Sequence, residues 1–196
     1  MLLLSKGYKP FIIMTYLLNI ALMGVFTLSG VLGATTSAVE THIYESPKVL
    51  AEISSLRLTG YNAVIEQTNE DPMTTASGAR SNHETIIARS RDMADILPYG
   101  TIVSLSYGGG GDSCGFQKVE HLVGYRVVAD TMHKRKTRQV DVLFGTEDVV
   151  RLKENRLNPA MVMGICEVDI RVVGYVPIKD IPSTQEELRL LVENSS

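Results

Sequence analysis

The sequence VVADT fills residues 127–131, and QVDVLF fills residues 139–144. Both runs are rich in β-branched residues, as short strands are, and each places one aspartate, Asp130 or Asp141, among apolar neighbours. Burying a carboxylate without a compensating contact costs several kcal/mol, because the charged group loses its water. Two aspartates in this setting, eleven positions apart, therefore require an explanation.

Two interpretations of these aspartates follow from the residues alone. In the structural one, an aspartate caps a turn at a strand end and the other pairs with Arg126 or Arg138. In the functional one, both belong to a catalytic or binding site. The connection between the runs carries the basic side chains His133, Lys134, Arg135, Lys136 and Arg138. A cluster of this kind is a solvated turn or an anion site for phosphate or carboxylate groups.

Strand patterns recur along the rest of the chain. Besides the two runs above, short apolar or alternating segments lie at residues 56–64, 84–90, 101–107 and 161–177. Six or so short strands without long helices between them predict a mainly β fold. We expect a small six-stranded barrel with short helices, rather than a sandwich or a parallel α/β sheet. Two of these helices are expected at residues 147–155 and 185–193, each after a Ser or Thr that serves as its N-cap.

The first forty residues differ from the rest. Lys6 and Lys9 precede a run without charges at residues 11–32, and small residues follow at residues 34–38. A positive start, an apolar middle and a small-residue exit are typical of a secretory signal, while 22 uncharged residues also suffice to span a membrane as a helix. The sequence therefore predicts export to the cell envelope, in the periplasm or on the outer face of the cytoplasmic membrane. It leaves open whether residues 11–32 remain as a membrane attachment.

These patterns divide the chain into three parts. Residues 1–38 are predicted to be an apolar signal peptide or membrane anchor helix, and residues 39–55 a tether that ends in a short helical stretch. Residues 56–196 are predicted to form the barrel domain. The length of 196 residues, with 44% hydrophobic and 21% charged residues, fits one globular domain with a short extra segment.

Composition narrows the choice of partners and cofactors. The formal net charge of −3 gives no indication of a nucleic-acid partner, and the basic cluster is local. Cys114 and Cys166 are too few for a zinc site, and the four histidines show no ligand spacing, so we expect neither a metal nor another cofactor. In an oxidising compartment the two cysteines either form a disulfide or remain separate thiols, and their spacing does not decide between these states.

Four short motifs occur in order along the chain: TASG at residues 75–78, LPYGT at 97–101, ADT at 129–131 and VDV at 140–142. Together they resemble the three-aspartate (3D) domain, a family found in membrane-bound lytic transglycosylases and related cell-wall proteins. The resemblance covers about residues 58–173. It departs from the family at residues 132–136, where MHKRK replaces a stretch that is rich in glycine and small residues.

The resemblance implies a fold, an activity and a set of residues. The fold would be a double-psi β-barrel, and the activity would be that of a lytic transglycosylase acting on peptidoglycan. Asp141 would be the proton donor, and Asp130 and a third aspartate would orient it, tune its pKa or bind the sugar. The third aspartate would be Asp92. Because Asp92 lies one residue farther from Pro98 than in the common pattern, Asp95 stays open as the alternative.

The residues around Asp141 fit this role on physical grounds. Cleavage of a glycosidic bond needs an acid whose pKa is raised towards neutrality. Apolar neighbours at Val140 and Val142 raise the pKa of a carboxyl by desolvation, and a second carboxylate nearby raises it by repulsion. In a lytic transglycosylase no separate base is needed, because the substrate's own C6 hydroxyl attacks and an anhydro-sugar forms. A single acid that later acts as the base is sufficient.

Two alternatives keep the same barrel. An inverting glycoside hydrolase needs a second carboxylate roughly 6.5–9.5 Å from the acid, with room for a water between them. A non-catalytic carbohydrate-binding barrel, as in expansin-like proteins, needs aromatic faces on which sugars stack. Candidates for such faces are Tyr61, Tyr99, Tyr107 and Tyr125. The absence of Trp and an aromatic content of only 6% count against this alternative.

A polar stretch after the first predicted strand offers groups that position a sugar. It runs from about residue 66 to residue 80, and long surface loops of this kind are often binding loops. The residues in and beside it that we predict to contact substrate are Asn62, Glu66, Gln67, Thr75 and Ser77. The alternative is that their amide, carboxyl and hydroxyl groups only satisfy the backbone of their own loop.

Overall fold

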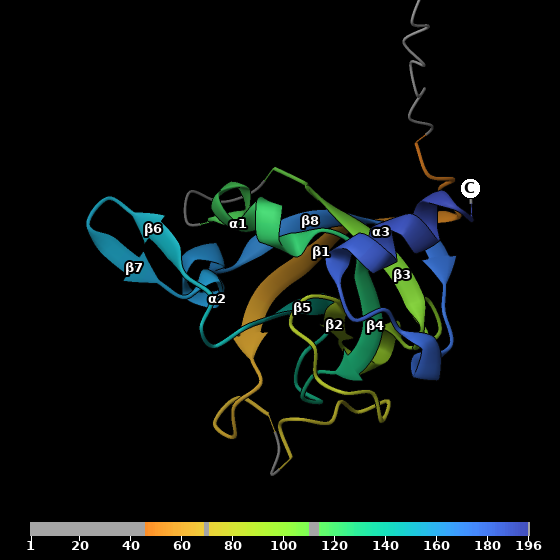
Figure 1. Cartoon of the computed structure of the whole chain (residues 1–196), viewed down its shortest axis with the longest axis horizontal. Coiled ribbons are helices and arrows are strands. Elements are labelled where there is room, and N and C mark those ends of the chain that lie inside the picture. The colour runs from red at the N-terminus through yellow and green to blue at the C-terminus, as the bar shows by residue number, and fades with distance from the viewer. Residues whose placement is uncertain (1–45, 69–70, 110–113, 196) are drawn as a thin grey trace, which may run out of the picture. The chain divides into compact units, whose positions relative to one another are not determined.

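The computed structural model describes residues 46–68, 71–109 and 114–195 (Figure 1). The predicted signal or anchor segment, residues 1–38, and the first part of the predicted tether lie outside these ranges. In the part of the chain that is described, no helix is long and apolar enough to cross a membrane.

The fold is mainly β and is built on a closed barrel of six strands, which confirms the predicted fold class at this level. The barrel strands are β1 (Ala51–Asn62), β2 (Ile86–Arg89), β3 (Thr101–Tyr107), β4 (Arg126–Thr131), β5 (Gln139–Phe144) and β8 (Cys166–Tyr175). Around the closed barrel they follow the order β1-β5-β2-β4-β3-β8. Strands β3 and β5 have the bounds that the sequence predicts, because Gly and polar residues flank both runs.

The order of the strands has an internal two-fold symmetry. The pairs β1·β5 and β2·β4 are parallel, and the remaining neighbours in the barrel are antiparallel. If β1 is exchanged with β4, β2 with β5, and β3 with β8, every strand keeps the same pattern of neighbours around the barrel. Strand β5 lies between β1 and β2, so the end of the chain's first strand and the segment at residues 139–144 become neighbours in the barrel.

The barrel interior is filled by aliphatic side chains that alternate along the strands. Fully buried examples are Leu56, Leu58, Ile87, Val103, Val128, Val140, Val142, Val168 and Ile170. Each lies two residues from the next on its strand or faces a partner on the neighbouring one, as the period of a pleated strand requires. This alternation directs the residues between them, including Asp141, to the outer face of the sheet.

Short helices and a hairpin complete the domain. The helices are η1 (Arg91–Met93), α1 (Phe116–Val123), α2 (Pro159–Met163), η2 (Ile178–Asp180) and α3 (Gln185–Glu193). The bounds predicted for α3 are confirmed, and its start is fixed by a capping box in which the Thr184 hydroxyl accepts from the backbone of Glu187. Helix α1 was not predicted.

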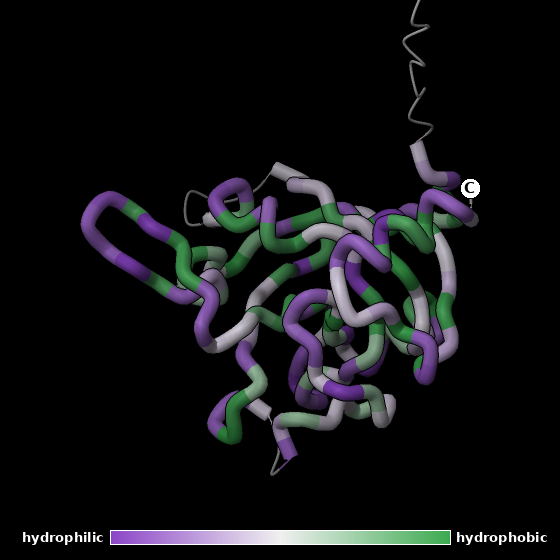
Figure 2. Tube along the Cα trace, viewed as in Figure 1, coloured by the Kyte–Doolittle hydropathy of each residue, from purple (hydrophilic) through white to green (hydrophobic). Residues whose placement is uncertain are grey.

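Three predictions about local structure are wrong. The β run expected at residues 161–177 begins only at Cys166, because Pro159–Met163 forms the helix α2, which Asn158 caps. Residues 147–155 form no helix, because a hairpin of β6 (Val150–Leu152) and β7 (Asn155–Leu157) occupies this region, with Lys153 at positive φ in its turn. This hairpin projects from the barrel and is largely hydrophilic (Figures 1 and 2). The segment before residue 56 is not a helical tether either, because β1 already begins at Ala51. A bulge with Ser55 at positive φ interrupts the alternation there, which explains why the strand pattern starts only at Leu56.

The pairing proposed for Arg126 in the structural interpretation of the aspartates is also wrong. Its guanidinium is 1% exposed and donates to backbone carbonyl oxygens instead of to Asp130 or Asp141. The accepting residues are His83, Ile86, Leu122, Val123 and Leu143. Burial lowers the pKa of this arginine to about 9, a value at which the group is still charged near neutral pH.

The two cysteines form a disulfide. Cys114, just before α1, is bonded to Cys166 at the start of β8, with a Cα–Cα distance of 4.9 Å. The bond closes a loop between positions 52 residues apart and holds α1 against the barrel next to α2. The alternative of two separate thiols is thereby excluded in this structure.

We predict that denatured, unreduced protein exposes no free thiol, because both cysteines are consumed by the bond. The double variant Cys114→Ser, Cys166→Ser should lose about 3–4 kcal/mol of unfolding free energy in the chain-entropy model, measured by urea denaturation. Reduced wild type is the matched control and should lose a similar amount. Two labelled thiols per chain in the unreduced protein would contradict the assignment.

Candidate active site

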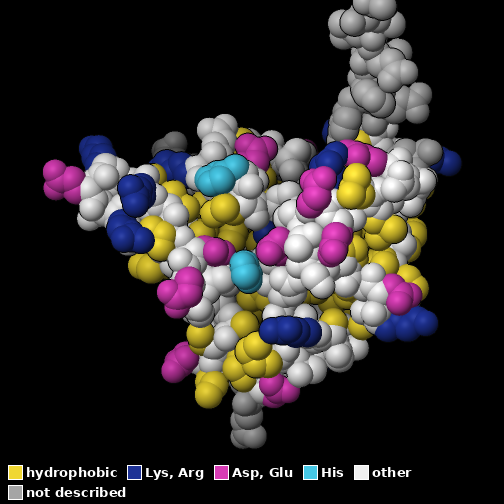
Figure 3. Space-filling view, viewed as in Figure 1, with side chains coloured by type: hydrophobic (Ala, Val, Ile, Leu, Met, Phe, Trp, Pro, Cys, Tyr) yellow, Lys and Arg dark blue, Asp and Glu magenta, His cyan; other side chains and the backbone are white. Residues whose placement is uncertain are grey.

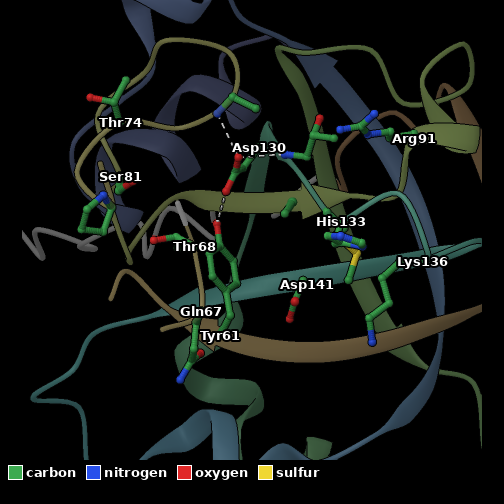
Figure 4. Close-up of a pocket in the computed structure, with 15 residues that line it drawn as sticks. Tyr61, Gln67, Thr68, Thr74, Ser81, Arg91, Asp130, His133, Lys136 and Asp141 are labelled. Atoms are coloured by element: carbon green, nitrogen blue, oxygen red, sulfur yellow. Dashed lines mark hydrogen bonds between the residues drawn. The ribbon is translucent and has the colours of Figure 1, made fainter. Parts of the chain in front are cut away.

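An open pocket of about 430 Å³ lies over the outer face of the sheet, where β2, β4 and β5 meet the long connection before β2 and the turn between β4 and β5 (Figure 4). Its walls come from the end of β1, the connection before β2, the ends of β2 and β4, and the turn between β4 and β5. The residues that line it are Tyr61, Gln67, Thr68, Pro72, Thr74, Ala76, Ser81, Ala88, Arg91, Asp130, Thr131, Met132, His133, Lys136 and Asp141. Both aspartates of the central runs are among them.

The register of the sheet brings the two aspartates together. On β2, Ala88 is paired with Asp130 of β4 on one side and with Asp141 of β5 on the other. The row continues to Thr59 of β1, which is paired with Asp141. Residues in one row point to the same face of a sheet. The methyl group of Ala88 therefore separates the two carboxylates without covering either.

Asp141 is the most perturbed acid of the site. Burial raises its pKa to about 7, and the negative charge of Asp130 adds to this rise. A hydrogen bond from Thr59 and the positive charge of Lys136 act in the opposite direction. Since the carboxyl is only partly enclosed and faces the pocket, it can hold a proton near neutral pH and still reach a bound molecule.

A directed pair of hydrogen bonds orients Asp141. The side-chain amide of Gln139 donates from Nε2 to Thr59 Oγ1 over 2.8 Å, and this hydroxyl donates to Asp141 Oδ1 over 2.9 Å. Because an amide nitrogen can only donate, the Thr59 hydrogen must point towards the carboxyl group. One oxygen of Asp141 is thereby held, which leaves Oδ2 as the oxygen on which a proton is available.

Asp130 has a different environment. Its Oδ2 accepts from the Tyr61 hydroxyl over 2.8 Å, and its Oδ1 accepts from the backbone N–H groups of Ala76 and Thr131 over 2.9 and 2.8 Å. These contacts join β1, the TASG turn and β4 (Figure 4). Asp130 therefore holds one wall of the pocket in place.

Tyr61 serves as a donor in this arrangement. Burial and the neighbouring charge of Asp130 raise the pKa of its hydroxyl well above the ordinary value, so the group keeps its proton. It is the only one of the four tyrosines considered for sugar stacking that lines the pocket. Tyr99 lies outside the pocket, where its ring faces the guanidinium of Arg89, whose Cζ is 4.8 Å from the ring centroid.

The third predicted aspartate is not brought to the site. Asp92 lies in η1, is exposed and does not line the pocket. A hydrogen bond from Ser90 and one from the backbone N–H of Arg138, over 3.0 Å, lower the pKa of Asp92. The contact with Arg138 anchors the segment that leads into β5. Asp95, the alternative, is exposed and also lies outside the pocket.

Of the five predicted substrate contacts, only Gln67 lines the pocket. Asn62 is buried and donates to the carbonyls of Phe144 and Gly145, and Thr75 is buried and donates to the carbonyl of Ala79. Ser77 contacts the Thr75 hydroxyl over 3.1 Å, and Glu66 is exposed beside the pocket wall without lining it. The alternative interpretation, satisfaction of the backbone of their own loop, describes Thr75 and also Gln67, whose Oε1 accepts from the backbone N–H of Asn62 over 2.8 Å. Asn62 instead satisfies carbonyls at the end of β5, and Ser77 contacts a side chain.

Sequence reasoning missed several residues of the site. Thr59 and Gln139 carry no motif. Gln139 lies two residues before Asp141 on β5, and the pairing of β1 with β5 places Thr59 beside both. Arg91, His133 and Lys136 also line the pocket. His133 and Lys136 belong to the basic cluster that the sequence shows, but the sequence could not distinguish a solvated turn from an anion site. Among the described residues, no group of three or more His, Cys, Asp or Glu side chains is arranged to hold a metal ion.

Asp141 should destabilise the fold as the pH rises. Its folded pKa is about 7 and its ordinary value is 3.8, so between these values the folded state binds more protons than the unfolded state, and stability falls with increasing pH. Asp141→Asn removes this penalty. The stability advantage of the variant over wild type, from urea denaturation, should grow by about 3 kcal/mol between pH 4.5 and pH 8.

Asp95→Asn is the matched control, since it changes an exposed carboxylate of the same size. Its stability relative to wild type should be nearly the same at both pH values. An advantage of Asp141→Asn that stays constant with pH would show that this carboxyl titrates in the folded protein as it does in the unfolded chain.

Comparison with known proteins does not assign the chain to a family. No protein-family model matches the sequence, and no curated protein matches it either.

Proposed function

We propose that this chain cleaves the glycan of peptidoglycan as a lytic transglycosylase does, with Asp141 as the general acid and then the general base. The observation that carries the proposal is a partly enclosed carboxyl with a pKa of about 7, facing an open polar pocket. The motif resemblance to the 3D domain supports the same residue. An acid of this kind is most effective when its pKa lies near the working pH.

The proposed reaction needs one carboxyl group. Protonated Asp141 gives its proton to the glycosidic oxygen as the bond between that oxygen and C1 breaks, and positive charge develops on the sugar ring. The carboxylate that remains then accepts the proton of the C6 hydroxyl of the same sugar, whose oxygen bonds to C1. The products are an anhydro-sugar and a chain with a free hydroxyl, and Asp141 is again protonated.

Asp130 is assigned a supporting role in this proposal. The row geometry puts the two aspartates two strands apart, about 10 Å at the backbone, so spacing alone does not exclude an inverting hydrolase. The carboxylate of Asp130 already accepts three hydrogen bonds, which leaves it poorly placed to activate a water. This favours the single-carboxyl reaction over the inverting one.

The alternative of a purely carbohydrate-binding barrel receives less support. Such a surface usually presents aromatic rings to sugar faces, whereas the pocket is lined by one aromatic residue, Tyr61, which is 8% exposed. A raised pKa also has no use in a binding module. Failure of purified wild type to release sugar fragments at any pH would nevertheless favour the binding function.

We also propose that the barrel is of the double-psi type. The support is the strand order, whose two parallel pairs are exchanged by the internal two-fold symmetry. One half consists of β1, β2 and β3, and the other of β4, β5 and β8. Each parallel pair takes one strand from each half, and two interlocked halves of this kind account for the strand order. The proposed place of action is the cell envelope, reached through residues 1–38 as a signal or an anchor.

Export can be tested with a reporter enzyme that is active only outside the cytoplasm. Fused after residue 60 of the chain, the reporter should be active, because the positive start and uncharged run at residues 11–32 direct it across the membrane. A fusion that lacks residues 1–38 is the control and should be inactive. An expressed but inactive full fusion would contradict export.

Asp141→Asn should abolish cleavage of purified peptidoglycan by the full-length chain in detergent, as measured by mass analysis of anhydro-muropeptides. The amide has the shape of the acid but cannot give up a proton, so the fold and glycan binding should be retained. Asp130→Asn should lower the rate by up to a few orders of magnitude through loss of positioning. Asp92→Asn should retain most of the activity, because Asp92 lies outside the pocket.

Undiminished cleavage by Asp141→Asn would remove the acid from this residue and transfer the assignment to Asp130. Products with a free reducing end of inverted configuration, instead of anhydro-sugars, would replace the transglycosylase reaction by an inverting hydrolysis.

A further inference from the structure

Three basic side chains line one side of the pocket. Arg91 comes from η1, and His133 and Lys136 come from the turn between β4 and β5. In Figure 4 they lie to one side of Asp141, while Gln67, Thr68, Thr74 and Ser81 lie to the other. The pocket is therefore divided into a cationic part and a part with neutral hydroxyl and amide groups, with the proposed acid between them.

None of these three side chains forms an ion pair with an acid in the described part of the chain. The ion pairs within 4.0 Å in the described part of the chain join Arg171 to Glu52 and Arg189 to two glutamates, all away from the pocket. Acidic and basic side chains are interspersed over the face seen in Figure 3, as expected for a chain with a net charge of −3. Basic side chains gathered on one side of a pocket whose other charged groups are Asp130 and Asp141 indicate an anionic group on the ligand at that side.

The turn geometry selects which bases face the pocket. The backbone N–H of Lys136 donates to the carbonyl of His133 over 2.9 Å, which closes a four-residue turn and brings its first and last residues together. Lys134 and Arg135 occupy the middle of the turn and do not line the pocket. The His133 Nδ1 accepts from the backbone N–H of Arg135 over 3.2 Å, so the neutral ring carries its hydrogen on Nε2 and is a donor there.

We propose that the glycan selected by this pocket is peptide-free, so that the sugar next to the bond that is cleaved carries a free carboxylate, and that Lys136, with Arg91 and His133, binds this carboxylate. The inference rests on the proposed function, since it names the class of substrate that the same site selects. The neutral side of the pocket, with Gln67 and the hydroxyl groups near it, takes an uncharged sugar. The substrate is thereby bound in one direction across Asp141.

Binding of the carboxylate also affects the acid. In the free protein the positive charge of Lys136 lowers the pKa of Asp141. A bound carboxylate neutralises that charge, so Asp141 holds its proton more firmly when the correct substrate is present. A neutral glycan gives no such compensation. Substrate charge thus contributes both to affinity and to the protonation state that the reaction needs.

The test measures the binding of two glycans, with and without carboxylates, to variants of two lysines, one inside the pocket and one outside it. The full-length Asp141→Asn chain in detergent serves as the background, so that binding is measured by calorimetry without cleavage. One probe is a peptide-free tetrasaccharide of alternating N-acetylglucosamine and N-acetylmuramic acid, and the other is the same sugar with its carboxylates converted to methylamides. The carboxylate form should bind about tenfold more tightly, as expected for loss of a charge-assisted hydrogen bond in the amide.

Lys136→Met should lower the affinity for the carboxylate form by about tenfold and leave that for the methylamide form unchanged. Lys134→Met is the matched control, since it removes the same charge from the same turn outside the pocket, and it should change either affinity less than twofold. Equal affinity for the two glycans, equal losses in the two lysine variants, or no binding of either glycan would overturn the inference.

Failure of this inference is distinguishable from failure of the proposed function. Cleavage of peptidoglycan by the wild type together with indifference to Lys136→Met would leave the function and remove the carboxylate site. Lys136-dependent binding without any anhydro product would leave the carboxylate site on a protein that binds glycan and does not cleave it.

Discussion

The buried guanidinium of Arg126 is the contact on which the arrangement of the strands depends. Its donors bind carbonyl oxygens of the segment before β2, of β2 itself, of β5 and of the end of α1. The two carbonyls from α1 belong to the last turn of that helix, where a cation is favoured by the helix dipole. A charge this deeply buried is tolerated only because its hydrogen bonds are complete, so these segments must assemble together.

The strand that begins with Arg126 has Asp130 as its last residue but one, so one short strand connects the anchor of the barrel to the wall of the pocket. The carboxylate of Asp130 accepts hydrogen bonds from β1, from the TASG turn and from the end of its own strand. Asp141, two strands away across Ala88, receives a hydrogen bond from Thr59 in compensation for its burial. The two aspartates have similar neighbours in the sequence but different roles. Asp130 accepts three hydrogen bonds and holds the pocket wall, whereas Asp141 accepts one from Thr59 and remains a weak acid.

This division has an energetic consequence. Asp130 contributes to stability through its hydrogen bonds, whereas Asp141 reduces stability once it is ionised. A fold selected for stability alone would not retain a partly desolvated acid next to a second carboxylate. The disulfide between Cys114 and Cys166 supplies compensating stability on the side of the barrel where α1 and α2 pack. Lys136 reduces the penalty only while it remains charged and close to Asp141.

The sequence by itself determined the mainly β class, six barrel strands, the helix at residues 185–193 and the two central aspartates, because strand alternation, caps and turn residues are local signals. It did not determine the parallel pairing of β1 with β5, since pairing depends on contacts between distant segments. That pairing puts Thr59 between Gln139 and Asp141, and tertiary structure likewise leaves Asp92 outside the pocket. The hairpin at residues 150–157 overrode a helix signal that was only local. Which basic residues face the pocket was decided by the turn between β4 and β5, because a turn's hydrogen bond orders side chains that look equivalent in sequence.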